Sequence, residues 1–441
     1  MKIKSIEVNN FKTFDKLSIN LQNLNFFIGQ NASGKSNFIN IFRFLKFIEE
    51  YGLKNAISLM GGDKYFRNVS GKDNLFSLKI NFELKEGRFN FQKDSLAKID
   101  YEDFIYEFVL DIVDNKIQII RDTLSIKCKY ASLPKKDVME ILDKRKSKSK
   151  NDSSDIKEIM DRFKKNKNNR KITIEVINNK VEGNNCEKNI TVNISGTNQL
   201  KETDLLPSFT PACFEPSNGT LLLELPYFRM FTGFSSKIFD EVAIFDFNPK
   251  ISKNESRIVA KTTLEEDGNN LPIVLKSIIE KPNKKKQFLN ILKDILPFAT
   301  DITIENRAYD LISFNIKEKY NNENFPSQFL SDGTINLTAI IVALFFEKKD
   351  IIVLEEPERF IHPSLVLKVM NLISDAAKKK QIFITTHNAQ FLRYAQAKNI
   401  FLVKRNNNGY SEINKLSKNK KLEKFLANDL GLDDLFLSNL L

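Results

Sequence analysis

A short segment near the N-terminus has the residue types needed to hold a phosphate chain. The eight residues from Gly29 to Ser36 read Gly-Gln-Asn-Ala-Ser-Gly-Lys-Ser and fit the pattern G-x-x-x-x-G-K-[ST]. Glycines let backbone N–H groups close on phosphate oxygens, the Lys35 ammonium neutralises charge, and the Ser36 hydroxyl is a ligand for Mg²⁺. An ordinary glycine turn is the alternative. It is disfavoured because the segment falls between a predicted strand and a predicted helix.

An apolar stretch further along the chain ends in acidic residues. Ile351–Leu354 is followed by Glu-Glu-Pro-Glu, from Glu355 to Glu358. A buried strand that ends in carboxylates places them beside the phosphate loop of a parallel sheet. One carboxylate can then complete the Mg²⁺ shell, and its neighbour can accept a proton from an attacking water. Alone, these acids are also compatible with the polar start of a loop, but Lys35 favours the catalytic interpretation.

The chain contains two histidines, His362 and His387. His387 follows the predicted strand Gln381–Thr385 closely, at the edge where phosphates are expected, and can hydrogen-bond a γ-phosphate or the attacking water. A purely structural role is the alternative for His387. For His362, which precedes Pro363 at a predicted helix start, the structural role is favoured.

Strands and helices of suitable spacing surround these residues. Lys2–Val8 and Leu24–Ile28 read as strands, and apolar positions at helical spacing predict a helix over Lys35–Glu49. Two short apolar strands, Ile351–Leu354 and Gln381–Thr385, flank a predicted helix over Ser364–Lys378. That β-α-β order implies parallel pairing, so the phosphate loop and the acids are expected at one edge of a sheet.

The middle of the chain follows other patterns. Alternating runs between Phe76 and Tyr130 predict an antiparallel sheet. The segment from Lys135 to Lys171 holds 14 Lys or Arg against 7 Asp or Glu, a large share of the net charge of +12. Its periodicity predicts an inserted helical hairpin, with an apolar stripe at Ile156, Ile159, Met160 and Phe163. Burial of this stripe inside the hairpin is favoured over a docking role.

Composition bounds the class of protein. The 441 residues, 41% of them hydrophobic, predict about two to four globular domains. Three well-separated cysteines disfavour a disulfide framework and a cysteine-rich zinc site. The longest apolar run is half a membrane span, and the N-terminus alternates charged and apolar residues instead of forming a secretory signal. The expectation is a cytoplasmic protein without membrane contact.

Taken together, the motifs resemble the ABC-type ATPase heads of the RecF, SMC and OLD group. Phe329-Leu-Ser-Asp-Gly-Thr334 resembles the signature loop of these ATPases. The other matching segments are Asn10–Phe14, Gly29–Asn37, Glu266–Leu271, Glu355–Glu358 with His362-Pro363, and Thr385–Asn388. The resemblance implies an α/β fold, a parallel P-loop core sheet with an antiparallel β-subdomain, here carrying an inserted helical hairpin. Nuclease-less ATPases of this group include defence-associated members.

The resemblance also implies roles for individual residues. Lys35 would bind the β- and γ-phosphates, Ser36 and Glu355 would bind Mg²⁺, Glu356 would be the general base, and His387 the switch histidine. The ATP contacts implied beyond these come from Lys12, Gly29, Asn31, Ser33, Gly34 and Asn37. Ser331, Asp332 and Gly333 would complete the site of a second subunit, so that two heads enclose two ATP molecules.

Three features depart from the family pattern. Glu355 stands where an aspartate is usual, no glutamine between Lys35 and Lys85 serves as a Q-loop residue, and little chain follows His387 to form an acidic nuclease domain. Long coiled-coil arms and a zinc hook do not fit into the insertion. The motifs divide the chain into an N-terminal ATPase lobe (1–132), a basic insertion with weak strands (133–205) and a C-terminal ATPase lobe (206–441).

Two biological roles remain open for an enzyme that hydrolyses ATP to ADP and phosphate. The favoured one is a sensor or scaffold that dimerises around ATP and controls a separate effector, a nuclease or toxin, in anti-phage defence. The other is a RecF-like DNA clamp in repair or recombination, with the basic segment 135–171 on backbone phosphates. A transporter ATPase is disfavoured by the Asn10–Phe14 start and by the antiparallel region.

Overall fold

A computed structural model of the chain describes residues 1–68, 74–84, 87–91, 95–113, 116–146, 158–163, 170–178, 190–198, 200, 219–225, 237–259, 262–306, 310–320, 323–418 and 432–438. The chain forms two compact units, which are not continuous in sequence. Unit 1 contains Met1–Asn20 and Arg43–Phe239, and unit 2 contains Leu21–Phe42 and Asp240–Leu441. The phosphate loop therefore belongs to the same unit as the acidic motif. The three-part division at 132 and 205 follows chain order instead, and it stays a prediction.

Unit 2 is built on a six-stranded sheet with the order β10-β15-β16-β3-β17-β18. The first five strands are parallel, and β18 pairs with β17 antiparallel. Their bounds are β3 (Leu24–Ile28), β10 (Val242–Phe245), β15 (Ile351–Glu355), β16 (Gln381–Thr386), β17 (Ile400–Arg405) and β18 (Ser411–Lys415). The predicted parallel pairing of the acidic strand with its successor is confirmed, and both end at the same edge as β3.

Successive side chains along these strands point to opposite faces of the six-stranded sheet, and both faces are apolar. Phe27, Phe383 and Phe401 stack as neighbours, and Phe27 also stacks on Phe38 of helix α1 (Lys35–Tyr51) with ring centroids 4.2 Å apart. The intervening residues, such as Phe26 and Ile384, join the core formed with helices on the opposite side. Because successive side chains of a strand point to opposite faces, both faces of the sheet are buried. This explains why β3 reads as an unbroken apolar run.

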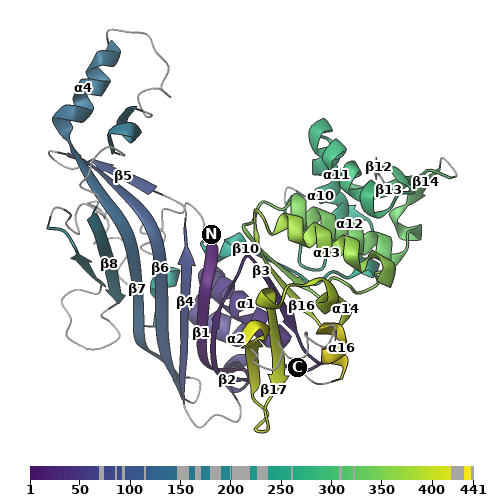
Figure 1. Cartoon of the computed structure of the whole chain (residues 1–441), viewed down its shortest axis with the longest axis horizontal. Coiled ribbons are helices and arrows are strands. Elements are labelled where there is room, and N and C mark those ends of the chain that lie inside the picture. The colour runs from purple at the N-terminus through teal and green to yellow at the C-terminus, as the bar shows by residue number, and fades with distance from the viewer. Residues whose placement is uncertain are drawn as a thin grey trace. The chain divides into compact units, whose positions relative to one another are not determined.

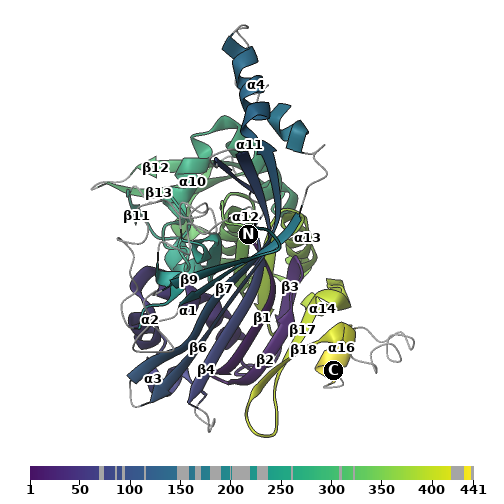
Figure 2. The same ribbon diagram turned by 90° about the vertical axis from the view of Figure 1, so that its left-hand side faces the viewer.

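Helices and a smaller sheet complete unit 2 (Figures 1 and 2). The main helices are α10 (Leu271–Ile279), α11 (Pro282–Ile295), α12 (Asp332–Phe345), α13 (Val366–Ala376), α14 (Gln390–Tyr394) and α16 (Leu432–Leu437), with the short α9 (Pro249–Ser252). The smaller sheet pairs β11 (Ser256–Arg257), β12 (Ala299–Asn306), β13 (Leu311–Glu318) and β14 (Asn324–Pro326). The buried side of α12 is continuous with the core of the main sheet, which fixes the start of α12 relative to β15.

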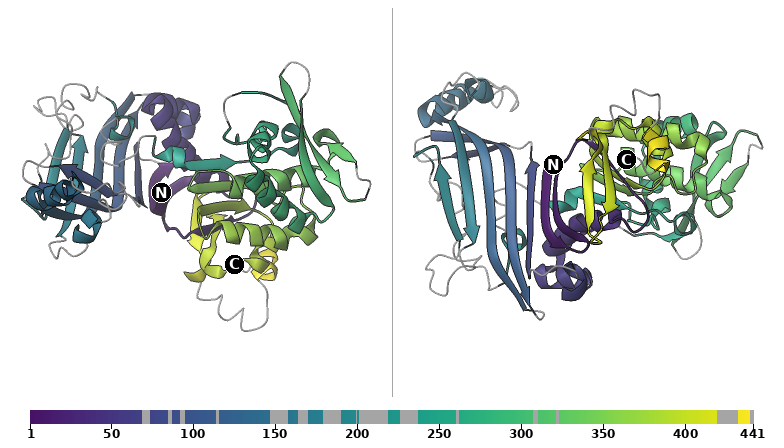
Figure 3. Two further views of the ribbon diagram at one scale, coloured as in Figure 1. Left: turned by 90° about the horizontal axis from the view of Figure 1, so that it is seen from above. Right: turned by 60° about the horizontal axis from the view of Figure 1, so that its bottom comes forward.

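Unit 1 is dominated by an antiparallel sheet with the order β2-β1-β4-β6-β7-β8-β9, and β5 pairs with β6. The predicted antiparallel region is confirmed, and the blue strands run side by side in Figure 3. The strands are β1 (Lys2–Phe11), β2 (Phe14–Asn20), β4 (Leu75–Glu83), β5 (Gly87–Phe91), β6 (Ser95–Val113), β7 (Lys116–Pro134), β8 (Arg170–Asn178) and β9 (Ile190–Ser195). Helices α2 (Leu53–Leu59) and α3 (Gly62–Phe66) also belong to this unit.

The basic insertion begins with helix α4 (Lys135–Lys146), inside the segment where the helical hairpin is predicted. Residues 158–163 are also helical, whereas Ile156 of the predicted apolar stripe lies outside the described residues. Phe163 packs into a small core with Leu96, Leu133 and Val138, and Ile159 packs against that core. Phe163 of the apolar stripe is therefore buried, partly against β6 and β7, whereas Ile159 and Met160 are partly exposed.

Among the residues that the structure describes, no helix is both long and apolar enough to cross a membrane.

Candidate active site

The phosphate loop joins the end of β3 to the start of α1. Ala32 and Gly34 have positive φ angles of 61° and 115°, which turn the chain sharply before the helix begins. Gly29 has no room for a side chain, because a Cβ there would lie 2.2 Å from the carbonyl oxygen of Val403. Both glycines of the motif are therefore required by backbone conformation or space, and they set the curvature of a phosphate-binding loop.

The Lys35 side chain folds back over this loop. Its Nζ donates to the carbonyl oxygens of Gly29 at 2.7 Å and Gln30 at 2.9 Å. Lys35 is 7% exposed, and burial lowers the pKa of its ammonium group. The charges of Glu356 and Glu358 act on it in the opposite direction. A buried cation held by neutral carbonyls gains strongly from an anionic ligand, as expected for a phosphate-binding lysine.

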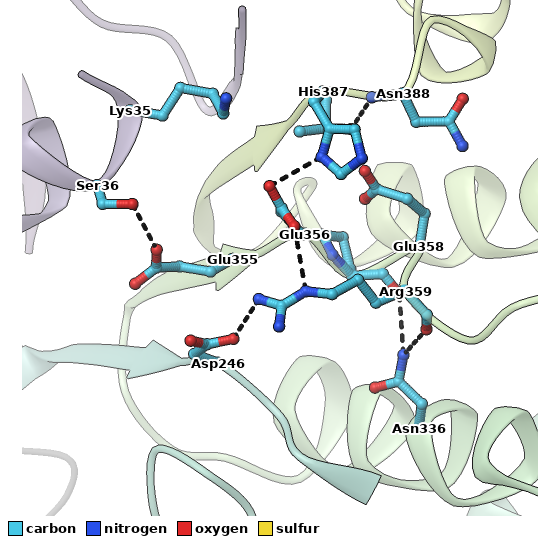
Figure 4. Close-up of polar contacts among 12 residues, drawn as sticks. Lys35, Ser36, Asp246, Asn336, Glu355, Glu356, Glu358, Arg359, His387 and Asn388 are labelled. Atoms are coloured by element: carbon cyan, nitrogen blue, oxygen red, sulfur yellow. Dashed lines mark hydrogen bonds and ion pairs between the residues drawn. The ribbon is translucent and has the colours of Figure 1, made fainter. Parts of the chain in front are cut away.

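Ser36 follows β3, and Glu355 is the last residue of β15. Both strands pair with β16, which lies between them, and this brings the two residues together. The Ser36 hydroxyl donates to Oε2 of Glu355 over 3.3 Å (Figure 4). Two neighbouring oxygen donors at the end of a phosphate loop suit Mg²⁺, which takes few protein ligands and fills its shell with phosphate oxygens and water. Among the described residues no group of three or more His, Cys, Asp and Glu gathers into a metal site.

Glu356 lies directly after β15 in a strained turn. Its φ angle is 43°, and its N–H donates to the carbonyl oxygen of Thr385 at 2.8 Å. This backbone bond joins the ends of β15 and β16 and turns the Glu356 side chain toward His387. His387 Nδ1 lies 2.9 Å from Oε1 of Glu356 (Figure 4). Positive φ is uncommon for a residue with a side chain, and such strain is concentrated at functional sites.

Three residues beside Glu356 were not predicted from the sequence. Arg359 forms ion pairs with Glu356, through Nε and Oε2 at 3.2 Å, and with Asp246, which follows β10. Asn336 of α12 donates to the carbonyl oxygens of Pro357 at 3.1 Å and Arg359 at 2.6 Å. Asn336 is a polar residue on the buried side of an apolar helix. This is the feature of the sequence that could have indicated a role for it.

Glu358 is the buried acid of the motif. It hydrogen-bonds the hydroxyl of Thr386, and burial raises the pKa of its carboxyl group. Thr386 Oγ1 also accepts a bond of 2.9 Å from the N–H of Asn388. Glu358 therefore connects the acidic turn to the segment that carries His387, and its position indicates a structural contribution to the site.

The signature segment forms the start of α12. Ser331 is the N-cap residue, and its Oγ accepts a hydrogen bond from the N–H of Thr334 at 3.2 Å. Asp332 pairs with Lys253 at 2.6 Å. Gly333 lies against the acidic turn, since a Cβ there would be 2.7 Å from the carbonyl oxygen of Phe360. Phe360 also has a positive φ, of 65°. The signature segment and the turn that carries Glu356 are therefore packed on each other.

The predicted site residues are distributed unequally between the units. Lys35, Ser36, Glu355, Glu356 and His387 all come from unit 2 and lie at one end of the parallel sheet (Figure 4). Asn31 is exposed, Asn37 is partly exposed and Ser33 is buried within the same loop segment.

Lys12 belongs to unit 1, where its Nζ donates to the carbonyl oxygen of Met60 at 3.0 Å, and its role in binding ATP stays a prediction. His362 caps a short 3₁₀ turn through Ser364, as favoured from the sequence.

Comparison with known proteins agrees with this geometry. A family described as "AAA domain, putative AbiEii toxin, Type IV TA system" matches residues 24–393. The chain belongs to this AAA-domain family. The matched range includes the phosphate loop, the signature segment, the acidic strand and His387, but not Lys12.

Two curated relatives are similar to shorter segments of this chain. DNA replication and repair protein RecF of Lactococcus lactis subsp. lactis (strain IL1403) is 35% identical over 72 residues, 16% of this chain and 20% of RecF. Endonuclease GajA of Bacillus cereus (strain VD045) is 41% identical over 100 residues, 22% of this chain and 15% of GajA. The chain thus spans at most a fifth of either relative. These matches confirm the resemblance to ATPases of the RecF, SMC and OLD group.

A solved structure of an Smc head, bound to the C-terminal winged-helix domain of ScpA, aligns with 96% of this chain and 100% of the head. The sequence identity is 12% and the TM-score is 0.48.

Proposed function

We propose that the chain binds ATP with Mg²⁺ and hydrolyses it to ADP and phosphate at the end of its parallel sheet. The observation that carries this proposal is the convergence of two pairs at one sheet edge. Ser36 and Glu355 present two oxygen ligands 3.3 Å apart, and Glu356 and His387 present a carboxylate and an imidazole 2.9 Å apart. The first pair suits a metal-bound nucleotide, and the second suits activation of water.

Each residue then has one task in hydrolysis. Lys35 exchanges its carbonyl partners for the β- and γ-phosphate oxygens, and N–H groups of the loop bind the remaining oxygens. Ser36 and Glu355 would hold the Mg²⁺, which neutralises phosphate charge when bound. Glu356 accepts a proton from the attacking water. His387 orients Glu356 through the contact of Nδ1 with Oε1.

ATP would also join two copies of the chain. Ser331 and Gly333 lie at the start of α12, where the helix dipole favours an anion. In the proposed dimer the signature segment of one copy, with Ser331, Asp332 and Gly333, faces the phosphates bound by the other. Hydrolysis removes the shared ligand and releases the pair.

The proposed biological role is that of a sensor and scaffold in the cytoplasm. The ATP-bound assembly would hold and restrain a separate effector, a nuclease or toxin, in defence against phages. The family description, which names a toxin, and the similarity to a protein named an endonuclease support this role. The candidate site of this chain is a nucleotide site, so the toxic activity is assigned to a partner.

Hydrolysis and dimerisation are tested together with Glu356→Gln, which keeps the size of the side chain and removes the base. The wild-type protein is expected to release phosphate from ATP in the presence of Mg²⁺. The Glu356→Gln variant is expected to bind ATP without turnover and to have twice the monomer mass by light scattering. Turnover by the variant at the wild-type rate would refute the assignment of the base, and an unchanged mass would refute the ATP-joined dimer.

The scaffold role is tested by phage challenge of cells that carry the gene with its chromosomal neighbours. Wild type, Lys35→Ala and Glu356→Gln are compared in plaque assays at equal protein levels. Protection by the wild type that is lost in either variant supports the role. Equal plaque counts with and without the genes contradict it.

A DNA clamp is the second candidate function. Lys135 and Lys136 at the start of α4 are exposed, as are Arg170 and Lys171 of β8, and a curated relative is named a DNA replication and repair protein. Exposed cations at backbone phosphates release counterions, so binding weakens steeply with salt. Stimulation of ATP turnover by duplex DNA at low salt, lost as salt rises, would favour the clamp. Turnover indifferent to DNA would favour the scaffold.

A further inference from the structure

Arg359 lies between two carboxylates at the candidate site. Its Nε is 3.2 Å from Oε2 of Glu356, and its terminal Nη2 forms an ion pair with Oδ1 of Asp246 (Figure 4). The guanidinium group thus joins the turn after β15 to the end of β10, the neighbouring strand. Nη2 also donates a hydrogen bond to Asp246, whereas the contact of Nε with Glu356 is an ion pair without a hydrogen bond.

The Glu356 carboxylate is consequently held through both of its oxygens. His387 Nδ1 contacts Oε1, and Arg359 Nε contacts Oε2. A glutamate side chain has considerable rotamer freedom, and a single contact leaves it free to swing. The attraction between Arg359 and Oε2 adds to the contact of His387 with Oε1 and favours the orientation in which the carboxylate lies between the two cationic or donor groups.

The Arg359 backbone is itself fixed. Its N–H donates to the carbonyl oxygen of Glu356 at 3.0 Å, and its carbonyl oxygen accepts a 2.6 Å hydrogen bond from the Asn336 amide. Asn336 is 2% exposed and is anchored in the buried side of α12. The guanidinium therefore extends from a rigid turn and reaches Glu356 at a defined angle.

Asp246 supplies the far anchor of the guanidinium. Its N–H donates to the carbonyl oxygen of Glu266 at 2.9 Å, which fixes its backbone after β10. The side chains of Arg359 and Asp246 are 39% and 43% exposed. Ion pairs with such exposure contribute little to folding stability, so the stability of unit 2 does not account for this arrangement.

We propose that Arg359 is a positioning residue for the general base Glu356, and that Asp246 acts through Arg359 by holding its guanidinium group. The inference rests on the proposed ATP hydrolysis. It adds Arg359 and Asp246 to the residues already assigned in the phosphate loop, in the acidic pair and at the switch histidine. Correct placement of a base affects the rate of the chemical step and leaves substrate binding unchanged.

The test measures kcat and KM for ATP in Arg359→Gln and Asp246→Asn. We expect kcat to fall at least about tenfold in Arg359→Gln, and by less in Asp246→Asn, with KM within twofold of wild type. Lys378→Gln and Asp375→Asn are the matched controls, since these residues form an exposed ion pair at 2.7 Å on and beside α13. Both controls are expected to keep the wild-type kcat.

Two further variants separate positioning from a general structural effect. Arg359→Lys keeps a charge within reach of Glu356 but cannot join both carboxylates, so its kcat is expected to lie between wild type and Arg359→Gln. Asp246→Asn is expected to cause no further loss of kcat in the Arg359→Gln background, because the guanidinium group that Asp246 holds is then absent.

The outcomes distinguish this inference from the proposed function. If wild type hydrolyses ATP and Glu356→Gln does not, hydrolysis stands. A kcat of Arg359→Gln within twofold of wild type, or a parallel rise in KM, would then overturn the role of Arg359. Additive losses in the double variant would overturn the role of Asp246. Absence of turnover in the wild type would instead remove the proposed function itself.

Discussion

The hydroxyl of Ser36 lies 3.3 Å from a carboxylate oxygen of Glu355, although 319 positions separate the two residues in the chain. The contact exists because β16 pairs with both β15 and β3 in parallel. Their carboxyl ends consequently meet at one edge, where a strand-to-helix loop and an acidic strand end provide complementary ligands.

Glu355→Gln removes one charged oxygen from this pair. We expect the Mg²⁺ concentration that gives half-maximal ATP turnover to rise at least about tenfold, because a neutral amide is a poorer ligand for Mg²⁺. The measurement is phosphate release over a Mg²⁺ titration. Glu412→Gln, an exposed acid of β18 in the same unit, is the control. Identical Mg²⁺ curves for Glu355→Gln and wild type would exclude Glu355 as a metal ligand.

Lys35→Ala removes the cation that faces the loop. We expect ATP affinity to fall about 100-fold, since hydrogen bonds between charged groups contribute roughly 1.5–3 kcal/mol each. Stability is not expected to fall, because burial of this ammonium is unfavourable, as the lowered pKa of Lys35 indicates. Calorimetric titration with ATP and thermal unfolding measure the two effects, with Lys378→Ala as control. ATP affinity within threefold of wild type would contradict the assignment.

Asn336→Ala removes the amide that bonds to two carbonyl oxygens of the acidic turn. Leaving buried carbonyls without partners is expected to lower the free energy of unfolding by about 1–3 kcal/mol. Urea denaturation measures this, and Asn55→Ala, which removes an exposed amide bonded to Tyr51, is expected to change it far less. Equal stability of Asn336→Ala and wild type would show that the acidic turn does not depend on the hydrogen bonds from Asn336.

Asp122 makes the stability of unit 1 depend on pH. It is buried, accepts bonds from Tyr106, Asn178 and the N–H of Leu222, and burial raises its pKa from 3.8 to about 7. A raised carboxyl pKa means that the folded state binds the proton more tightly. The contribution of this group to stability is therefore complete below about pH 4 and is lost as pH rises to about 7.

The Asp122→Asn variant keeps the shape of the side chain and removes this titration. Its free energy of unfolding, measured by urea denaturation between pH 4.5 and 7.5, is expected to fall less with rising pH than that of wild type. Parallel stability curves for the two proteins would contradict the raised pKa of Asp122.

The sequence predicted elements whose signal is local. β3 and α1 were predicted within two residues of their ends, because Leu24–Ile28 is an unbroken apolar run before a glycine and α1 has clear helical spacing. Glu356 and His387 could be named as catalytic candidates because each follows a recognisable strand, and their catalytic roles stay predictions. Pairing of two apolar strands in a β-α-β unit was enough to place them on one edge.

Residues whose contacts depend on distant packing were not predicted. Arg359 is one of 68 basic residues, and its partner Asp246 lies 113 positions earlier, after a strand of four residues. Asp122 lies in β7, inside the region predicted as antiparallel sheet, but its partners come from β6, β8 and the 3₁₀ turn Leu222–Glu224. Such contacts depend on strand register and three-dimensional packing, which no local pattern encodes.

The position of β3 in the middle of its sheet has a consequence for synthesis of the protein. Both strands that flank β3, β16 and β17, are translated more than 350 residues after it. At about 5–20 residues per second, roughly 20–70 s pass on the ribosome before the first of them emerges. During that interval the apolar strand Leu24–Ile28 has neither sheet neighbour, so the growing chain depends on chaperones or early packing against α1 to avoid aggregation.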